Sequence, residues 1–457
     1  MNSNSARQMA PRLPRARNYD LPNGFIFGAS TSAYQVEGAT RQDGRGDSIW
    51  EPFLSKPRTP AFDLGDVACD HYNRYRDDVG LMRGLNLDAY RFSIAWPRIF
   101  PNGEGKVNEA GLDFYDRLVD ELLAAGIDPY VTLYHWDLPL ALQKKYHGWF
   151  GRETALRFAD YSAVMVKRLG DRVNKWATLN EPEVIIAGYI GDGMAPAMNL
   201  PRSGHKVGHH LMLGHALSLQ AMRAARSGIE CGVVLNLCPV DPADPSDPAS
   251  VEAARSRWST AYAWYMDALF KGHYPNEVLD LLDRSDGGGN PIKAGDMSLI
   301  AQSIDFLGIN YYTRFRANAK GEFVETPGAP VTQMGWEMVP DSFTRMLIDI
   351  DREYDLPPMY ITENGAALDD VVTETGRIHD RGRIKYIDDH LAAIARATAA
   401  GVDVRGYFVW SLMDNLEWPL GFAKTFGLTH IDRTTLKRTV KDSGRWYSKT
   451  VAKNRAR

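Results

Sequence analysis

Eight short apolar segments, rich in β-branched and aromatic residues, recur along the chain and have the length and content of β-strands. Residues 130–134 (YVTLY) and 407–410 (YFVW) are apolar on both alternating faces, which is typical of parallel strands covered on two sides. The expected strands are 25–30, 87–96, 129–136, 173–180, 231–238, 304–312, 359–363 and 405–412. A parallel sheet of this size needs a crossover connection after each strand.

Helical patterns lie between these segments and supply the crossovers. Apolar residues recur at helical spacing over 112–123, 156–169 and 386–399. We expect Gly126 and Gly170 to end the first two helices in the left-handed conformation. No Gly/Ser-rich or charged linker divides the chain. The alternation therefore predicts an α/β protein in which residues 18–457 form a single (β/α)₈ TIM barrel rather than a doubly wound sheet.

Three connections are much longer than an ordinary loop, namely residues 41–69, 183–205 and 314–340. Long loops on the C-terminal (βα) face of a barrel build its active site. A proline-rich polar stretch carries Pro239, Pro242, Pro245 and Pro248. Because proline lacks a backbone N–H, we expect this stretch to be a rim loop that does not pair in a sheet.

Composition and charge exclude several classes of protein. The 457 residues are 44 % hydrophobic and 24 % charged, so the chain is not a disordered one. The net charge of −4 predicts no general attraction to nucleic acid or to an anionic membrane. Three cysteines without CxxC spacing indicate neither a disulfide framework nor a zinc cluster. Residues 1–17 carry arginines but no apolar core of a signal peptide, so we expect a disordered basic tail and a cytoplasmic protein.

Polar and aromatic side chains gather at the C-terminal ends of the expected strands. These ends converge on one mouth of a barrel, so the side chains should face a common site. Carboxylates, amides, an imidazole and indoles together suit a neutral, hydroxyl-rich ligand, because hydroxyls take paired hydrogen bonds and aromatic faces cover a sugar ring. The candidates are Gln35, Arg91, His135, Asn180, Glu181, Asn310, Tyr312, Glu363, Trp410, Glu417 and Trp418.

Two glutamates among them, Glu181 and Glu363, supply the pair that glycosidic cleavage requires. One carboxylic acid protonates the leaving oxygen, and a second carboxylate meets the oxocarbenium-like carbon. Either residue alone is also typical of a solvated turn. We expect Arg91 and Tyr312 to hold one carboxylate ionised while the other stays protonated in a drier position.

The motifs around these residues match a known family. TLNEP, YITENG, VWSLMDNLEW, TSAYQVEG and GRGDSIW resemble glycoside hydrolase family 1, whose best-known members are β-glucosidases. The resemblance extends from about residue 25 to residue 446 and includes RFSIAWPRI and KDSGRWY. It implies a (β/α)₈ barrel independently of the strand pattern.

The resemblance also implies roles for individual residues. Glu181 would be the acid/base and Glu363 the nucleophile of a retaining exo-β-glycosidase that acts on small β-glucosides or β-linked oligosaccharides without cofactor or metal. Retention implies a carboxyl separation of about 5 to 5.5 Å. Trp336 would be the platform for the leaving group. Arg91, Asn310 and Tyr312 would support Glu363 and the 2-hydroxyl side of the sugar. The sugar would be bound by Gln35, His135, Asn180, Trp410, Glu417 and Trp418.

Some positions depart from the family pattern or separate its branches. Enzymes for 6-phosphosugars typically have Ser, Lys and Tyr where this chain has Glu417, Lys424 and Phe426. Because a carboxylate at 417 repels phosphate, we expect an unphosphorylated sugar. Glu183 stands where an aromatic residue is common, and Pro419, Phe422 and Thr425 are also unusual. These departures leave the identity of the leaving group open. The choice among glucose, galactose and fucose as the sugar is also open.

Two other functions are alternatives to a glycosidase. A non-catalytic sugar-binding barrel is the main alternative, since fold alone does not determine activity. A metal-dependent hydrolase is disfavoured because no second ligand accompanies His135 at metal spacing. His209, His210 and His215 lie in an apolar helical segment, where hydrogen-bonded or exposed side chains are more common than a ligand set. The sequence leaves open whether the protein forms a homo-oligomer.

Overall fold

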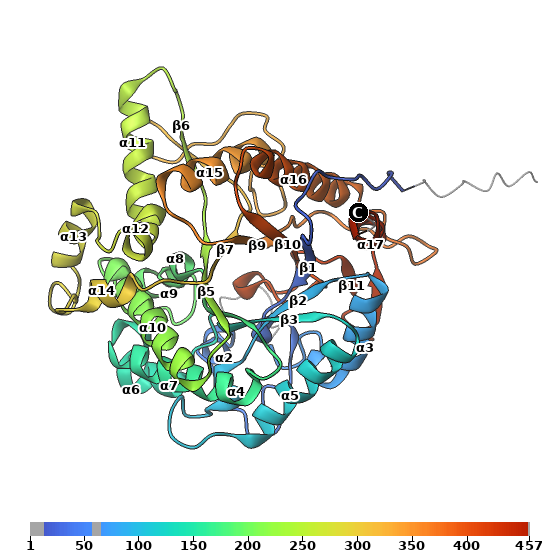
Figure 1. Cartoon of the computed structure of the whole chain (residues 1–457), viewed down its shortest axis with the longest axis horizontal. Coiled ribbons are helices and arrows are strands. Elements are labelled where there is room, and N and C mark those ends of the chain that lie inside the picture. Colours follow the sequence, from blue (N-terminus) through green and yellow to red (C-terminus); the bar gives the residue numbers. More distant parts are fainter. Residues whose placement is uncertain (1–12, 57–64, 456–457) are drawn as a thin grey trace, which may run out of the picture.

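Eight parallel strands close into a barrel in the computed structural model, which describes residues 13–56 and 65–455 (Figure 1). Strands that follow one another in the barrel are hydrogen-bonded neighbours, and β10 closes the ring by pairing with β1. The barrel strands are β1 (Ile26–Ser30), β2 (Ala89–Ser93), β3 (Asp128–Tyr134), β4 (Lys175–Asn180), β5 (Glu230–Asn236), β7 (Phe306–Asn310), β9 (Met359–Asn364) and β10 (Val404–Trp410). The predicted (β/α)₈ barrel is confirmed.

Long helices surround the barrel, and their apolar faces pack on the strands. They are α3 (His71–Gly84), α5 (Glu109–Ala124), α7 (Glu153–Leu169), α10 (Gly204–Ala225), α15 (Pro340–Glu353), α16 (Arg381–Ala399) and α17 (Asp442–Arg455). Shorter helices lie in the connections: α1 (Ala33–Val36), α2 (Trp50–Leu54), α4 (Trp96–Ile99), α6 (Leu140–Tyr146), η1 (Gly148–Phe150), α8 (Pro182–Ile185), α9 (Ala187–Ile190), α11 (Pro248–Trp258), η2 (Ser259–Ala263), α12 (Trp264–Phe270), α13 (Asn276–Asp283), α14 (Asp296–Ile300) and η3 (Trp418–Leu420).

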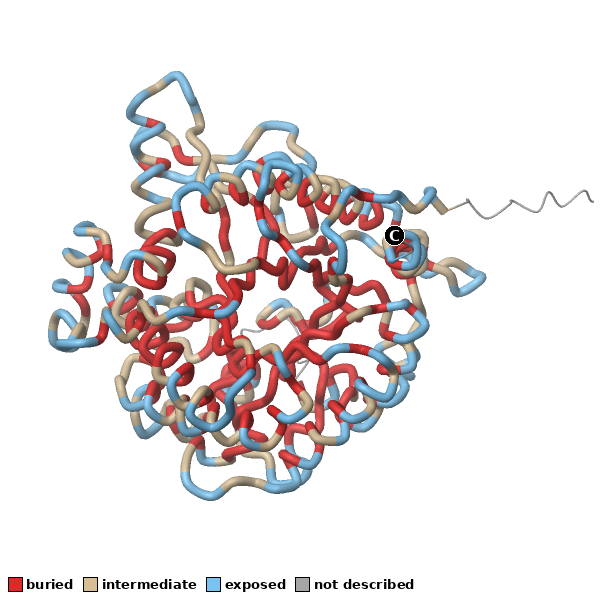
Figure 2. The backbone as a smooth tube through the Cα atoms, in the orientation of Figure 1, coloured by how far each residue is buried: buried red, intermediate tan, exposed pale blue. Residues whose placement is uncertain are grey.

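Buried side chains fill the barrel itself as well as the layer between strands and helices. Figure 2 shows the ring of strands as mainly buried, with exposed residues on the outer helices. Inside the ring, Tyr130 packs against Phe408 and Tyr360, with ring centroids 5.0 and 5.7 Å apart. The barrel is therefore a packed core, which gives the side chains at the strand ends a rigid support.

The proline-rich stretch corrects one expectation, because part of it does pair. β6 (Val240–Pro242) forms a two-stranded parallel sheet with β8 (Phe315–Ala317). The bonds that flank the pair run from the Phe315 N–H to the Pro239 carbonyl and from the Ala243 N–H to the Ala317 carbonyl. Proline takes part here as an acceptor only, so its missing N–H does not prevent pairing at an edge.

The predicted helix ends are right at Gly126 and wrong at Gly170. Gly126 has a φ of +72°, the left-handed value that favours glycine. Gly170 has a φ of −68°, which any residue adopts. A Cβ at this position would lie 2.5 Å from the Val166 carbonyl oxygen and 2.8 Å from the Arg226 side chain. Close packing therefore explains this glycine, and backbone conformation does not.

The tail that was predicted to be disordered, residues 1–17, lies mainly outside the described residues, which begin at residue 13. Residues 16 and 17 lie against the C-terminal helix α17: Lys453 Nζ donates to the Ala16 carbonyl at 2.9 Å, and Asn454 Nδ2 donates to the Arg17 carbonyl at 3.2 Å. Among the described helices, none has both the length and the apolar character needed to span a membrane.

Candidate functional site

A cavity of about 370 Å³ opens where the barrel strands end. Eight of the twelve predicted site residues line it: His135, Glu181, Tyr312, Trp336, Glu363, Trp410, Glu417 and Trp418. The other four, Gln35, Arg91, Asn180 and Asn310, are buried outside its lining and hydrogen-bond to residues around it. The site therefore has an inner wall that faces the cavity and a second layer of polar side chains that holds the wall in place.

Glu363, near the end of β9, is held by two short hydrogen bonds. Arg91 on β2 donates from Nη1 to Oε1 at 2.6 Å, and the Tyr312 hydroxyl donates to Oε2 at 2.6 Å. All three side chains are buried. One donor on each oxygen fixes the plane of the carboxylate, and the guanidinium compensates its charge.

Glu181 has a different environment directly after β4. It caps the N-terminus of α8 with a φ of +51°, and its N–H donates to the Val234 carbonyl at 2.9 Å. The carboxyl group accepts one hydrogen bond, from Asn310 Nδ2 to Oε1 at 2.7 Å. Burial, followed by the charge of Glu363, raises the pKa of Glu181 well above its ordinary value. The environment of Glu181 thus favours its protonated form, next to a carboxylate whose charge Arg91 compensates.

An amide network behind the cavity joins the two glutamates. Asn180 Oδ1 accepts from Arg91 Nη2 at 2.7 Å and from Asn310 Nδ2 at 3.0 Å. Asn310 was expected to support Glu363 and the 2-hydroxyl side of the sugar, and its amide donates to Glu181 and Asn180. Asn310 is the last residue of β7 and lies opposite Glu363 in the register, while Asn236 of β5 is its other neighbour. The strand pairing does not determine which carboxyl the amide reaches.

Stacked rings form the inner end of the cavity. The His135 ring lies nearly parallel to Trp410 and Trp418, with centroids 5.8 and 6.0 Å apart and interplanar angles of 18° and 19°. Burial, with a smaller contribution from Arg91, holds the pKa of His135 well below its ordinary value, so the imidazole is neutral. Burial also raises the pKa of Glu417 to about 8, and the charge of Glu363 adds to the shift. This end combines aromatic faces with groups that can exchange hydrogen bonds with hydroxyls.

Gln35 lies beneath this end and outside the cavity lining. Its amide nitrogen donates to the Leu416 carbonyl at 2.7 Å and to Asn415 Oδ1 at 3.1 Å, and its oxygen accepts from Ser32 at 2.6 Å. The structure therefore brings Gln35 to the loop that carries Glu417, with the amide bonded to protein groups.

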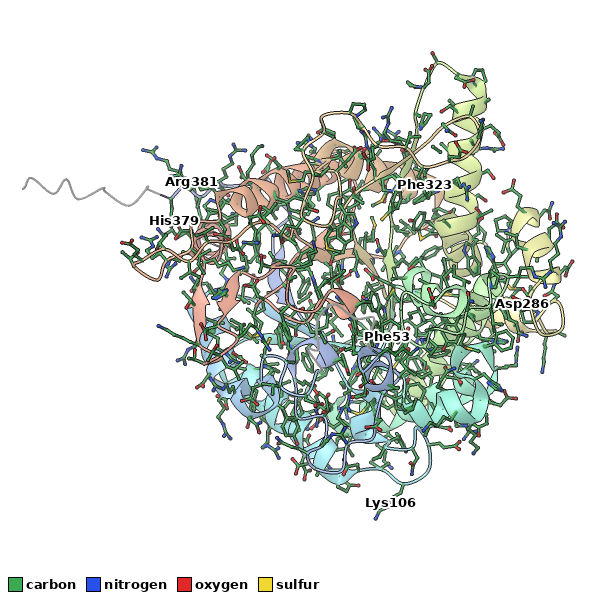
Figure 3. The ribbon with its side chains drawn as sticks, turned by 180° about the vertical axis from the view of Figure 1, so that it is seen from behind. Phe53, Lys106, Asp286, Phe323, His379 and Arg381 are labelled. Atoms are coloured by element: carbon green, nitrogen blue, oxygen red, sulfur yellow. The ribbon has the colours of Figure 1, made fainter. Side chains whose placement is uncertain are left out.

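The outer part of the cavity is mainly apolar. Trp336 lies in the long connection 314–340 and packs beside Tyr312, with ring centroids 5.2 Å apart. Phe323 of the same connection lies against α11, beneath Arg257 (Figure 3). The residues that complete the outer wall were not predicted from the sequence, because residues of these types are common throughout a protein. They are Val184, Gly193, Met194, Asn236, Met334 and Leu420.

The three clustered histidines are hydrogen-bonded core residues. His209 bonds Tyr274 and Asp296, whereas His210 bonds the Trp149 carbonyl and His215 the Thr178 hydroxyl. Over the described residues, no group of three or more His, Cys, Asp or Glu side chains is arranged to hold a metal ion. The interpretation of these histidines as hydrogen-bonded side chains is confirmed.

Comparison with known proteins gives matches over nearly the whole chain. The model of glycosyl hydrolase family 1 matches residues 17–456. Beta-glucosidase A of Thermotoga maritima is 45 % identical over 443 residues, which are 95 % of this chain and 98 % of that protein. The bifunctional beta-D-glucosidase/beta-D-fucosidase of Bifidobacterium breve is 41 % identical over 467 residues, with 96 % and 99 % covered. A solved Thermotoga maritima family 1 β-glucosidase, in complex with isofagomine lactam, superposes with a TM-score of 0.91 at 43 % identity, covering 96 % of this chain and all of that one.

Proposed function

The chain belongs to glycosyl hydrolase family 1 and is an O-glycosyl hydrolase, and from this premise we propose that it is a retaining exo-β-glucosidase. It releases terminal non-reducing β-D-glucosyl residues by double displacement. The observation that carries the proposal is the contrast between Glu181 and Glu363 at one cavity. Glu363 accepts from a cation and a hydroxyl, while burial and neighbouring charge keep Glu181 protonated.

The two carboxyl groups divide the first step between them. Glu181 donates its proton to the glycosidic oxygen as the bond from that oxygen to the anomeric carbon breaks. Glu363 Oε forms a bond to the same carbon from the opposite face, giving a glycosyl-enzyme ester. Arg91 and Tyr312 hold the nucleophile at its reactive angle during the attack.

The second step reverses these roles. Glu181, now ionised, accepts a proton from water as the water oxygen bonds to the anomeric carbon, and the ester bond to Glu363 breaks. Two inversions restore the β configuration. Once the ester has formed, Glu363 carries no charge, which removes one influence that raises the pKa of Glu181. The same carboxyl group can therefore act first as an acid and then as a base.

The sugar lies at the ring-lined end, where the cavity is closed by Trp410, Trp418 and His135. Glu417 can accept hydrogen bonds from a sugar O4 in either orientation. We therefore include lower activity on β-galactosides and β-fucosides in the proposal, in keeping with the name of the Bifidobacterium relative. A 6-phosphate is disfavoured, because Phe426 in the cavity wall has no hydroxyl to donate to it and Lys424 Nζ already donates to the Gln333 carbonyl.

The leaving group lies against the outer wall. This wall presents mainly apolar surface and one polar side chain, that of Asn236. Its apolar residues are Val184, Met194, Met334, Trp336 and Leu420. Methionine side chains adapt to irregular shapes. This wall favours alkyl or aryl β-glucosides over β-linked oligosaccharides, whose hydroxyls would lose water without gaining partners.

A panel of p-nitrophenyl glycosides tests the proposed function. We expect turnover of the β-glucoside, lower turnover of the β-galactoside and β-fucoside, and none of the α-glucoside or the 6-phospho-β-glucoside, with no effect of EDTA. Octyl β-glucoside should have a higher kcat/KM than cellobiose. Binding of glucosides without turnover of any β-glycoside would favour the sugar-binding barrel, and loss of activity in EDTA would favour a metal-dependent hydrolase.

A further inference from the structure

A short segment that follows β9, residues 366–370, is hydrogen-bonded to two connections that carry residues of the cavity wall. The first is the sugar-side loop, residues 411–427, which includes Glu417. The second is the leaving-group segment, residues 332–336, which includes Trp336. The central segment, residues 366–370, therefore lies where it can hold both ends of the cavity.

Hydrogen bonds join the central segment to each connection. The Thr425 hydroxyl of the sugar-side loop donates to the Leu368 carbonyl at 2.7 Å. The Gln333 N–H of the leaving-group segment donates to the Ala367 carbonyl at 2.9 Å. The two connections are also bonded to each other, because Lys424 Nζ donates to the Gln333 carbonyl at 2.8 Å. A shift of the central segment would thus be transmitted to both.

The central segment ends at Asp370, whose side chain is only 3 % exposed. Arg383 of α16 donates from Nη1 to Oδ1 and from Nη2 to Oδ2, both at 3.0 Å. Lys441, which precedes α17, donates from Nζ to Oδ2 at 2.6 Å. Both cations are buried as well. Since lysine and arginine are rarely buried without an acidic partner, this carboxylate is required where it lies.

The same two cations also contact the sugar-side loop directly. Arg383 Nη2 donates to the Thr425 carbonyl. Lys441 Nζ donates to Asp414 Oδ1 at 2.6 Å, and the Gly427 N–H donates to the same oxygen at 2.8 Å. One buried group of charges therefore binds the central segment and both ends of the sugar-side loop.

We propose that Asp370 is a positioning residue for substrate binding: its buried ion pairs with Arg383 and Lys441 fix the central segment, to which the sugar-side loop and the leaving-group segment are hydrogen-bonded. The inference rests on the proposed function and adds a group that supports the substrate-binding walls from behind. Asp370 lies outside the cavity lining and acts through the two connections.

Replacement of Asp370 by Asn tests this role. The amide keeps the shape of the side chain but removes the charge that balances two buried cations, so the central segment and both connections should loosen. Glu181, Glu363 and their hydrogen-bond partners are unaltered. We expect KM for octyl β-glucoside to rise by about three- to tenfold and kcat to change by less than about twofold.

Asp296→Asn is the matched control. Asp296 of α14 is also a buried carboxylate that accepts two hydrogen bonds from one arginine, Arg152, at 2.8 and 2.5 Å. Within the described chain, no hydrogen bond joins Asp296 to the sugar-side loop or to the leaving-group segment. Both variants should unfold at a lower temperature than the wild type, but only Asp370→Asn should raise KM. An unchanged KM in Asp370→Asn, or an equal rise in both variants, would overturn the inference.

Amide hydrogen exchange provides a measurement that needs no turnover. In Asp370→Asn we expect peptides of the sugar-side loop and of the leaving-group segment to exchange about tenfold faster than in the wild type, and those in Asp296→Asn to be unchanged.

Thr425→Val keeps every charge and removes only the bond to Leu368, so it serves if Asp370→Asn does not fold. It should accelerate exchange in the sugar-side loop alone. Unchanged exchange there would contradict the proposed role of the central segment. If the panel of glycosides showed no turnover, the proposed function would fail while the exchange rates would still decide the role of Asp370.

Discussion

Replacement of Glu363 by Gln is expected to lower kcat/KM for p-nitrophenyl β-glucoside by about 10⁴-fold or more. The amide keeps the size of the side chain but cannot form the glycosyl ester. It also loses the charge that Arg91 compensates at 2.6 Å. The measurement is steady-state turnover of the purified variant at neutral pH, with binding of a glucose-like inhibitor measured in parallel.

Inhibitor binding separates lost chemistry from lost folding. Because Trp410, Trp418 and His135 are unaltered, the variant should still bind the inhibitor, with an affinity within about tenfold of wild type, or 1.4 kcal/mol. Glu252→Gln, which removes one exposed negative charge from α11, is the matched control and should retain full activity. A Glu363→Gln enzyme that keeps a tenth of wild-type turnover would exclude Glu363 as the nucleophile.

Replacement of Glu181 by Ala is the second large effect. Loss of a general acid typically costs about 10² to 10⁴ in rate, and less for activated aryl leaving groups. Glu181→Ala should therefore lose this factor with methyl β-glucoside and much less with 2,4-dinitrophenyl β-glucoside. It should also accumulate the glycosyl-enzyme with the activated substrate, because the base of the second step is gone.

Azide provides a chemical check on the same variant. With the carboxylate removed, azide can enter beside Asn310 and attack the glycosyl-enzyme, and it needs no base. We expect a rise in turnover and a β-glycosyl azide as the product. An α-glycosyl azide would reverse the assignment of the two glutamates.

Much of the barrel was predictable from the sequence because its signals are local. A strand covered on both faces must be apolar throughout, and each of the eight expected segments overlaps a barrel strand. The sequence-based predictions were wrong at positions where tertiary packing, and not local backbone preference, determines the residue. Gly170 is a glycine because the Val166 carbonyl lies close to it, and Pro239 pairs through its carbonyl.

The site was predictable to the extent that strand ends define it. Polar residues at those ends face one mouth, so Glu181, Glu363, His135 and Tyr312 could be placed together. The targets of the amides could not be predicted, because rotamers and not register decide whether Asn310 reaches Glu181 or Glu363.

The outer wall was also beyond prediction from the sequence. Met194 and Met334 come from long connections without hydrophobic periodicity, and only the folded chain brings them to the cavity.

The most direct measurement is the configuration of the first sugar released. Proton NMR of a concentrated reaction on p-nitrophenyl β-glucoside, recorded before mutarotation, distinguishes the two anomers. Double displacement by Glu363 with Glu181 as acid and base predicts that β-glucose appears first and the α-anomer only later. Initial release of α-glucose would mean a single displacement by water and would contradict the proposed mechanism.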